Sequence, residues 1–309
     1  MRPFRFAVQC SKHATARSWR DYARQLEGLG YSTLFMPDHF DDQWAQFPAL
    51  TAAAEATTSL RVGSLVFDND YRHPLVLAKE CATLDLLSEG RFEVGLGAGW
   101  LKADYDQSGI AYDGHAERIG RLEEAVRVMK GLWSDETVDF DGRFYQLNNA
   151  QGFPRPHSPG GPPLIIGGGG RRMLRLAVEH ADIIGVNASL TSGAIDAETM
   201  ASVSRGRFEE RIGWVREDAG DRFADLELQS LTFATKLGPP RSETAEELSK
   251  LFGFPPEEVA ASPAVLIGTE NEIVETLIER RERMGFSYWV LHDGDVEPFA
   301  PVVARLAGT

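Results

Sequence analysis

The sequence predicts an α/β protein folded as a (β/α)8 TIM barrel with insertions. Three observations favour this fold: short apolar runs recur along the 309 residues, an amphipathic helical stretch follows each run, and no shift in composition marks a domain boundary. A doubly wound open sheet is the alternative. We therefore expect one domain over residues 1–309, with insertions near residues 135–162 and 232–265.

Short runs rich in β-branched and aromatic side chains mark the expected strands. They span residues 4–9, 32–37, 60–67, 91–97, 163–167, 181–187, 225–233 and 287–293. Helices are expected at residues 18–30, 47–58, 74–90, 117–133, 171–180, 198–219, 269–285 and 298–308. Pro74 suits the first turn of its helix, and Thr269 forms a capping box with Glu272. A hairpin is expected over residues 137–147, turning at Asp141-Gly142.

The chain is acidic, with 46 acidic against 32 basic residues and a net charge of −14. That balance argues against a nucleic-acid partner and against an anionic membrane surface. No run reaches the roughly 18–20 apolar residues of a membrane span, and we expect no signal peptide in the first residues. Cys10 and Cys81 cannot build a disulfide framework. We expect a cytoplasmic protein that acts on a small molecule.

A strand, four glycines and a helix start meet in PLIIGGGGRR, residues 163–172. Arg172 stands where a dinucleotide fingerprint needs its third glycine, and no P-loop motif occurs. Glycine N–H groups at a helix N-terminus still suit an anion such as phosphate, to which an arginine adds charge. A tight turn without a ligand is the alternative. The candidate anion site consists of Gly167, Gly168, Gly169, Gly170 and Arg171.

Asp38-His39 follows a strand directly in MPDHF. At the carboxyl end of a barrel strand such a pair can carry a proton, because histidine titrates near neutral pH. The alternative is a loop aspartate that caps a helix, beside a packed histidine. None of the seven histidines stands at a metal-ligand spacing, and neither H-E-x-x-H nor G-x-S-x-G occurs, so we expect no metal site and no hydrolase elbow.

Other strand ends supply a candidate substrate pocket. Glycines at 95, 97 and 99 alternate before Trp100, which leaves room on one barrel face for a flat group. Tight packing against a neighbouring strand is the alternative. The aromatic residues among the candidates are equally plausible as core. The candidate pocket residues are Gln9, Trp44, Asn69, Trp100 and Tyr105.

Several stretches together resemble the luciferase-like monooxygenase superfamily, in its branch of coenzyme F420-dependent oxidoreductases. They are residues 28–40 (GLGYSTLFMPDHF), 71–100, 117–133, 140–147 (FDGRFYQL), 163–170 and 181–187. The resemblance covers roughly residues 4 to 187. It implies a (β/α)8 barrel that binds a flavin or deazaflavin at its mouth, and a homodimer.

The resemblance also implies roles for individual residues. The turn at residues 167–170 and Asn187 would hold the phosphate of F420, or of FMN. Asp38 and His39 would lie beside the deazaflavin ring, where His39 would handle the proton. A non-proline cis peptide near Leu65-Val66 would support the ring. The remaining cofactor residues, at one strand end, would be Gly97, Ala98 and Gly99.

The resulting hypothesis is an F420-dependent oxidoreductase that moves a hydride between the deazaflavin C5 and an organic substrate. An FMN-dependent monooxygenase, which needs O2 and a partner reductase, is one alternative, and a flavin-binding protein without turnover is another. The Asp38-His39 pair, in place of a Glu-His-His arrangement, favours F420. Trp100 stands where sugar-phosphate dehydrogenases of this branch carry a glutamate general acid, which favours an apolar or conjugated substrate.

Overall fold

The computed structural model describes residues 1–134 and 137–309. Two compact units divide the chain. The first comprises Met1–Cys10, Gln25–Thr33 and Ile166–Thr309, and the second comprises Ser11–Arg24 and Leu34–Ile165. Residues 135 and 136, at the start of the first expected insertion, lie outside the described residues. The expected single domain stays a prediction.

Parallel strands form the core of the first unit. In the order in which they pair, they are β1 (Arg5–Gln9), β13 (Phe286–His292), β10 (Glu227–Leu231), β9 (Ile183–Val186) and β8 (Leu164–Gly168), whose first two residues belong to the second unit. Six of the seven residues of β13 are buried, as a parallel strand covered on both faces requires. Arg5 lies opposite Tyr288 and Gln9 opposite His292 in the β1–β13 ladder. Burial on both faces explains why these five strands read as short apolar runs in the sequence.

Helices alternate with these strands. They are α6 (Arg171–His180), α7 (Ala197–Ala201), α8 (Arg205–Ala219), α11 (Glu270–Met284) and α12 (Val296–Leu306), with short 3-10 turns at Gly220–Asp225 and Asp293–Asp295. The predicted capping box of Thr269 and Glu272 is present, and α11 ends at Gly285 with φ 92°. The single helix expected over residues 198–219 is wrong. Ser204 adopts an extended conformation and starts α8 anew after α7.

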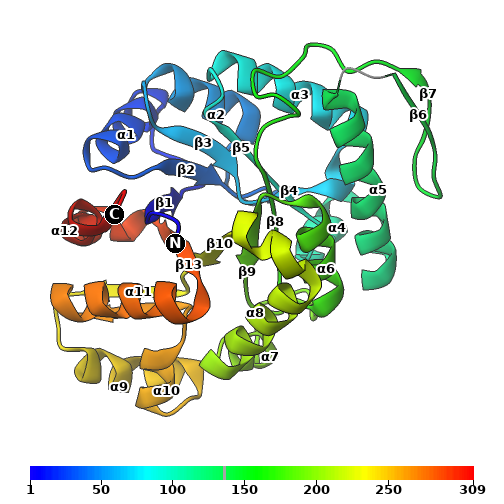
Figure 1. Ribbon diagram of the computed structural model, residues 1–309. Coiled ribbons are helices and arrows are strands. Elements are labelled where there is room, and N and C mark those ends of the chain that lie inside the picture. The colour runs from blue at the N-terminus through cyan, green and yellow to red at the C-terminus, as the bar shows by residue number, and fades with distance from the viewer. Residues whose placement is uncertain (135–136) are drawn as a thin grey trace. The chain divides into compact units, whose positions relative to one another are not determined.

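The expected insertion near residues 232–265 contains two short helices, α9 (Arg241–Phe252) and α10 (Pro256–Ala261). It also contains a parallel pair of strands that the sequence analysis did not predict, β11 (Ala234–Leu237) and β12 (Val265–Gly268). Figure 1 shows α9 and α10 together beside α11.

The second unit has its own parallel strands, which are β2 (Thr33–Met36), β3 (Arg61–Ser64), β4 (Phe67–Asp68) and β5 (Phe92–Gly97). The strand expected over residues 60–67 is broken into β3 and β4 at Leu65-Val66, where the peptide bond is cis. Both halves pair with β5. The pairing of β3 with β5 also closes the sheet, as a barrel requires and a doubly wound sheet does not.

The helices of the second unit include one that the sequence analysis missed, α4 (Lys102–Ser108). The others are α1 (Ala16–Gly28), which crosses the unit boundary, α2 (Gln46–Glu55), α3 (Pro74–Leu87) and α5 (His115–Trp133), with a 3-10 turn at Asn69–Tyr71. The predicted hairpin is present as antiparallel β6 (Val138–Asp141) and β7 (Gln146–Ala150). Figure 1 shows it at the edge of this unit, near the end of α5.

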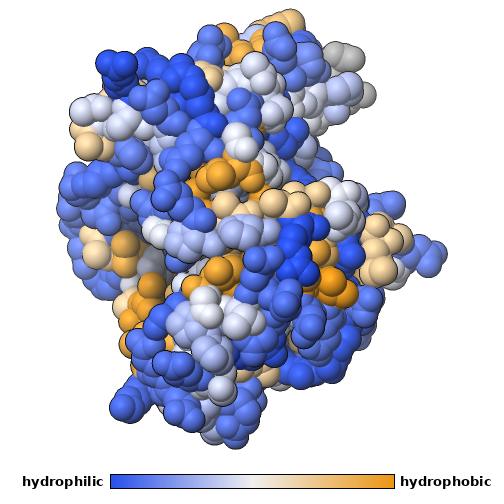
Figure 2. All heavy atoms as spheres, turned by 90° about the vertical axis from the view of Figure 1, so that its left-hand side faces the viewer, coloured by the Kyte–Doolittle hydropathy of each residue, from blue (hydrophilic) through white to orange (hydrophobic). Residues whose placement is uncertain are grey.

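The alternation of parallel strand and helix along the described residues confirms the predicted (β/α)8 TIM barrel with insertions. The face in Figure 2 is mainly hydrophilic, and its hydrophobic groups form small separate areas. Over the described ranges, no helix combines the length and the apolar composition needed to cross a membrane.

Gly63 in β3 lies where the neighbouring elements leave no room for a side chain. A Cβ there would lie 2.6 Å from the Glu93 carbonyl oxygen and 2.6 Å from the Phe35 ring. Gly63→Ala is therefore expected to lower the free energy of unfolding by about 1–3 kcal/mol. At Gly213 in α8 a Cβ meets nothing within 4 Å, so Gly213→Ala is the control and should add about 0.5–1 kcal/mol. Urea unfolding measures both, and a Gly63→Ala variant as stable as the parent contradicts the packing.

Candidate active site

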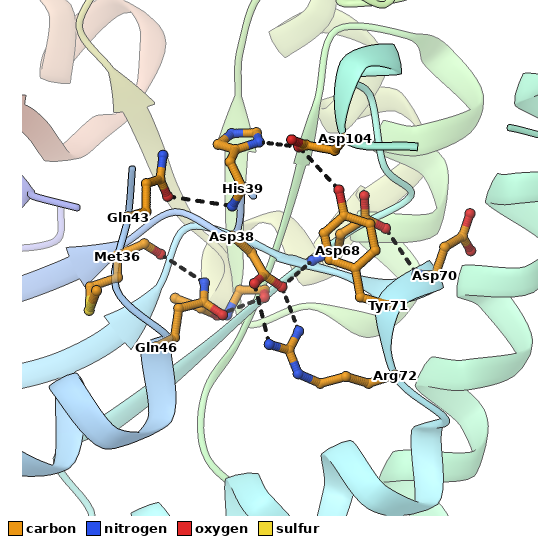
Figure 3. A network of polar contacts seen from close by, with 12 residues as sticks. Met36, Asp38, His39, Gln43, Gln46, Asp68, Asp70, Tyr71, Arg72 and Asp104 are labelled. Carbon is orange, nitrogen blue, oxygen red and sulfur yellow. Dashed lines mark hydrogen bonds and ion pairs between the residues drawn. The ribbon is translucent and has the colours of Figure 1, made fainter. Parts of the chain in front are cut away.

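A buried polar network surrounds the ends of β2 and β4 in the second unit (Figure 3). The Asp38 carboxylate accepts from Arg72 Nη1 at 2.6 Å and Nη2 at 3.3 Å, and from the Asp68 N–H at 3.1 Å. Burial lowers the pKa of the Arg72 guanidinium, but its hydrogen bond to Asp38 and the charge of that carboxylate raise the pKa overall. The Asp38 carboxylate thus pairs with Arg72 and not with His39, its neighbour in sequence.

The carboxylate that contacts His39 is Asp104, from α4. His39 Nδ1 lies 2.7 Å from Asp104 Oδ2. Asp104 is 4% exposed and also accepts from the Phe40 N–H at 3.2 Å and the Tyr71 hydroxyl at 3.1 Å. The sequence analysis missed Asp104 because it missed α4. The signal available in the sequence was an acidic residue four positions after Trp100, soon after the end of an expected strand.

The His39 ring is held on a second side by Trp100, which follows β5. The two ring centroids are 5.6 Å apart and the planes are perpendicular. The His39 side chain keeps 21% of its surface exposed. Among the described residues its Nε2 has no hydrogen-bond partner. The structure therefore brings two predicted residues together and leaves one ring nitrogen available.

Asp68 lies deeper in the network and accepts from the Asp70 N–H at 2.9 Å and from the Tyr105 hydroxyl at 3.2 Å. Burial raises the pKa of Asp68 to about 7, and these hydrogen bonds oppose that shift only in part. Burial and the neighbouring carboxylates raise the pKa of the Tyr71 and Tyr105 hydroxyls, so both donate as neutral phenols. Tyr105 is 1% exposed and belongs to the core.

The cis peptide predicted near Leu65-Val66 is present at that bond. Val66 occupies the room that the glycines of β5 leave: a Cβ at Gly95 or Gly97 would lie 2.9 or 2.6 Å from its methyl groups. Gly99 has φ 74°, and a Cβ there would lie 2.6 Å from Asp68 Oδ2. These contacts favour the tight-packing alternative at the glycines over a space for a flat group.

In the first unit, the glycine turn joins β8 to α6. A Cβ at Gly167 would lie 3.0 Å from Asn187 Nδ2, and one at Gly169 would lie 2.6 Å from backbone that follows Asn187. The Asn187 N–H donates to the Gly168 carbonyl at 3.2 Å. Gly170 is the N-cap of α6, where no side chain caps the helix and its first turn holds no acidic residue. The first three glycines serve close packing, while the helix N-terminus remains suited to an anion.

A buried cation lies behind the same turn. Arg211 of α8 is 3% exposed and donates to the carbonyls of Gly169 at 2.9 Å and Ser202 at 2.6 Å. Burial lowers its pKa to about 10, and no carboxylate in the described part of the chain pairs with it. Arg171, the predicted anion ligand, instead pairs with Glu217 at 2.8 Å. The two hydrogen bonds of Arg211 therefore hold the glycine turn from behind.

The other predicted pocket residues, Trp44, Asn69 and Gln9, belong to three separate segments of the chain. Trp44 contacts the Trp19 ring edge-on at 5.8 Å. Asn69 is 1% exposed and donates to the Tyr145 hydroxyl at 3.3 Å. Gln9 ends β1 in the first unit. Within residues 1–134 and 137–309 no group of three His, Cys, Asp or Glu side chains could hold a metal.

Comparison with known proteins identifies the relatives of this chain. Residues 2–219 match the family model described as luciferase-like monooxygenase. The F420-dependent glucose-6-phosphate dehydrogenase of Kineococcus radiotolerans is 32% identical over 88% of this chain and 86% of that protein. The same-named enzyme of Amycolatopsis mediterranei is 31% identical, but there this chain spans only 50% of the relative's length. The F420-dependent tetrahydromethanopterin reductase of Methanopyrus kandleri shares the fold, with a TM-score of 0.76, 18% identity and 98% and 99% coverage.

The raised pKa of Asp68 predicts that the free energy of unfolding of the protein depends on pH. Burial raises the folded-state pKa of Asp68 to about 7, well above the ordinary value of an aspartate, so between these values the folded protein keeps a proton that the unfolded chain has lost. Stability from this group therefore falls as pH rises from about 4 to 7. Asp68→Asn, which cannot titrate, should gain about 1–3 kcal/mol relative to the parent between pH 5 and pH 8. Urea unfolding at both pH values measures this, and a constant difference contradicts it.

Proposed function

Because this chain belongs to the luciferase-like monooxygenase family, we propose that it is a coenzyme F420-dependent oxidoreductase acting on an organic substrate. Bound F420 would supply a hydride acceptor or donor at its C5. The observation that carries the proposal is the His39 ring, fixed by Asp104 and Trp100 with Nε2 available. Relatives that match most of the chain are F420-dependent dehydrogenases.

The cofactor phosphate would be held at the N-terminus of α6. Gly170 leaves that helix end uncapped, and the helix field favours an anion there. Arg211 supplies a buried positive charge behind the turn. Asn187 stays in the proposal because its N–H contacts the Gly168 carbonyl. Arg171, at the start of α6, also stays in the proposal, since its ion pair with Glu217 is exposed to solvent and such pairs are weak.

His39 would move the proton that accompanies the hydride. Histidine can do this at neutral pH in either direction, so the same residue serves substrate oxidation and substrate reduction. Asp38 would act indirectly, since its carboxylate holds Arg72 and the Asp68 backbone. The cis peptide at Leu65-Val66 would support the ring.

The substrate proposal is an apolar or conjugated molecule. Trp100 stands beside His39, where an ionised side chain would instead favour a polar substrate. Its indole offers apolar surface and a single donor. The relatives act on glucose 6-phosphate by name, and we propose that this chain differs from them in substrate. A homodimer, which the resemblance implies, and a cytoplasmic location, which the sequence composition favours, complete the proposal.

Cofactor titration tests the function. We expect purified apo-protein to bind F420 at least ten-fold more tightly than FMN, followed by fluorescence for each cofactor. Reduced F420 should then be oxidised when unsaturated or carbonyl substrates are added. Tighter binding of FMN, with O2 consumed when reduced FMN is supplied, would instead establish the monooxygenase alternative. Binding of F420 without turnover over a broad substrate panel would establish a binding protein.

His39→Ala tests the proton-handling role. General acid-base catalysis contributes about 10²–10⁴-fold, so kcat should fall by at least about 10²-fold while the Kd for F420 stays within a few-fold. His73→Ala is the matched control, because His73 is exposed at the N-cap of α3 in the same unit. Unchanged turnover in His39→Ala would remove this residue from the mechanism.

A further inference from the structure

We propose that Asp104 is the positioning residue of the active site, which holds His39 as the tautomer with its proton on Nδ1 and its lone pair on Nε2. The inference rests on the proposed function for its catalytic consequence. Its structural part, the state of the His39 ring, stands without that function.

The donors around Asp104 fix the direction of the bond. Its two carboxylate oxygens accept from the Phe40 N–H and the Tyr71 hydroxyl as well as facing His39 Nδ1. The Phe40 amide can only donate, and the raised pKa of Tyr71 keeps its phenol a donor. An ionised carboxylate accepts only. The hydrogen of the 2.7 Å bond therefore belongs to His39 Nδ1.

The protonation of Nδ1 determines the state of the other ring nitrogen, Nε2. A neutral imidazole with Nδ1 protonated carries its lone pair on Nε2. That nitrogen has no partner in the described chain, and the side chain is 21% exposed. Proton transfer to or from a substrate would therefore pass through Nε2, and the resulting imidazolium would be stabilised by the Asp104 charge.

The other contacts of Asp104 explain why it can hold this geometry. It lies in α4 and is 4% exposed, so little water competes for its oxygens. The Tyr71 hydroxyl binds the same oxygen as His39, and the Phe40 N–H binds the other. Figure 3 shows Asp104 between His39 and Tyr71. Three donors from two segments thus fix the carboxylate before any ligand binds.

The competing carboxylate is Asp38, which is next to His39 in sequence. Its oxygens are occupied by Arg72 and the Asp68 N–H. It therefore supports the loop and does not set the histidine tautomer. Replacing each aspartate separately distinguishes these two roles.

The test combines ring-nitrogen NMR with kinetics on the full chain. In 15N spectra, with the His39 signals assigned by their loss in His39→Gln, we expect Nδ1 protonated and Nε2 bare in the parent protein. Asp104→Asn should abolish that preference, because an amide can either donate or accept. It should also lower kcat with F420 by on the order of 10–10³-fold, with KM and the Kd for F420 within about three-fold. Asp104→Glu should restore part of kcat.

Asp106→Asn is the matched control, since Asp106 is on the same helix, pairs with Lys102 and is 62% exposed. It should leave tautomer and kcat unchanged. An unchanged His39 tautomer in Asp104→Asn overturns the proposal, as does a loss of F420 affinity equal to the loss of kcat. If the parent protein does not oxidise or reduce F420, the proposed function fails, and the NMR result alone then decides the role of Asp104.

Discussion

The structure of the candidate site depends on the burial of four carboxylates around the ends of β2 and β4. Asp38, Asp68, Asp70 and Asp104 are all largely removed from water. A buried charge is costly unless it is paired or hydrogen-bonded. Each carboxylate here accepts from a guanidinium, an N–H or a phenol. Burial and the neighbouring carboxylates also raise the pKa of Asp68 to about 7, which lowers the negative charge in the network.

The pairing of these carboxylates also holds together the segments around His39. Arg72 ties the loop after β2 to the segment after β4 through Asp38. Tyr71 and Tyr105 turn their hydroxyls inward to Asp104 and Asp68. The polar network is rigid because its members satisfy one another. His39 is the member that both joins the network and keeps a free nitrogen at its edge, so the fold presents it already oriented.

Much of this could be predicted from the sequence, and the failures have physical causes. Apolar periodicity located the barrel strands and most helices, and the capping box of Thr269 marked a helix start. α4 was missed because its seven residues carry no apolar period. Asp104 was missed with it, and Asp38 was paired with His39 because sequence adjacency hides the direction of a side chain. Arg211 could not be foreseen, since its contact with Gly169 joins residues 42 positions apart.

The central claim is that His39 meets the reacting atoms through Nε2 while Asp104 holds Nδ1. The most direct measurement is a crystal structure of the protein with F420 and a bound substrate or inert analogue. The account predicts His39 Nε2 within hydrogen-bond distance of the polar atom beside the reacting carbon, with the bond from Nδ1 to Asp104 intact. A complex in which the ring or substrate binds away from His39, or in which His39 turns from Asp104, would contradict it.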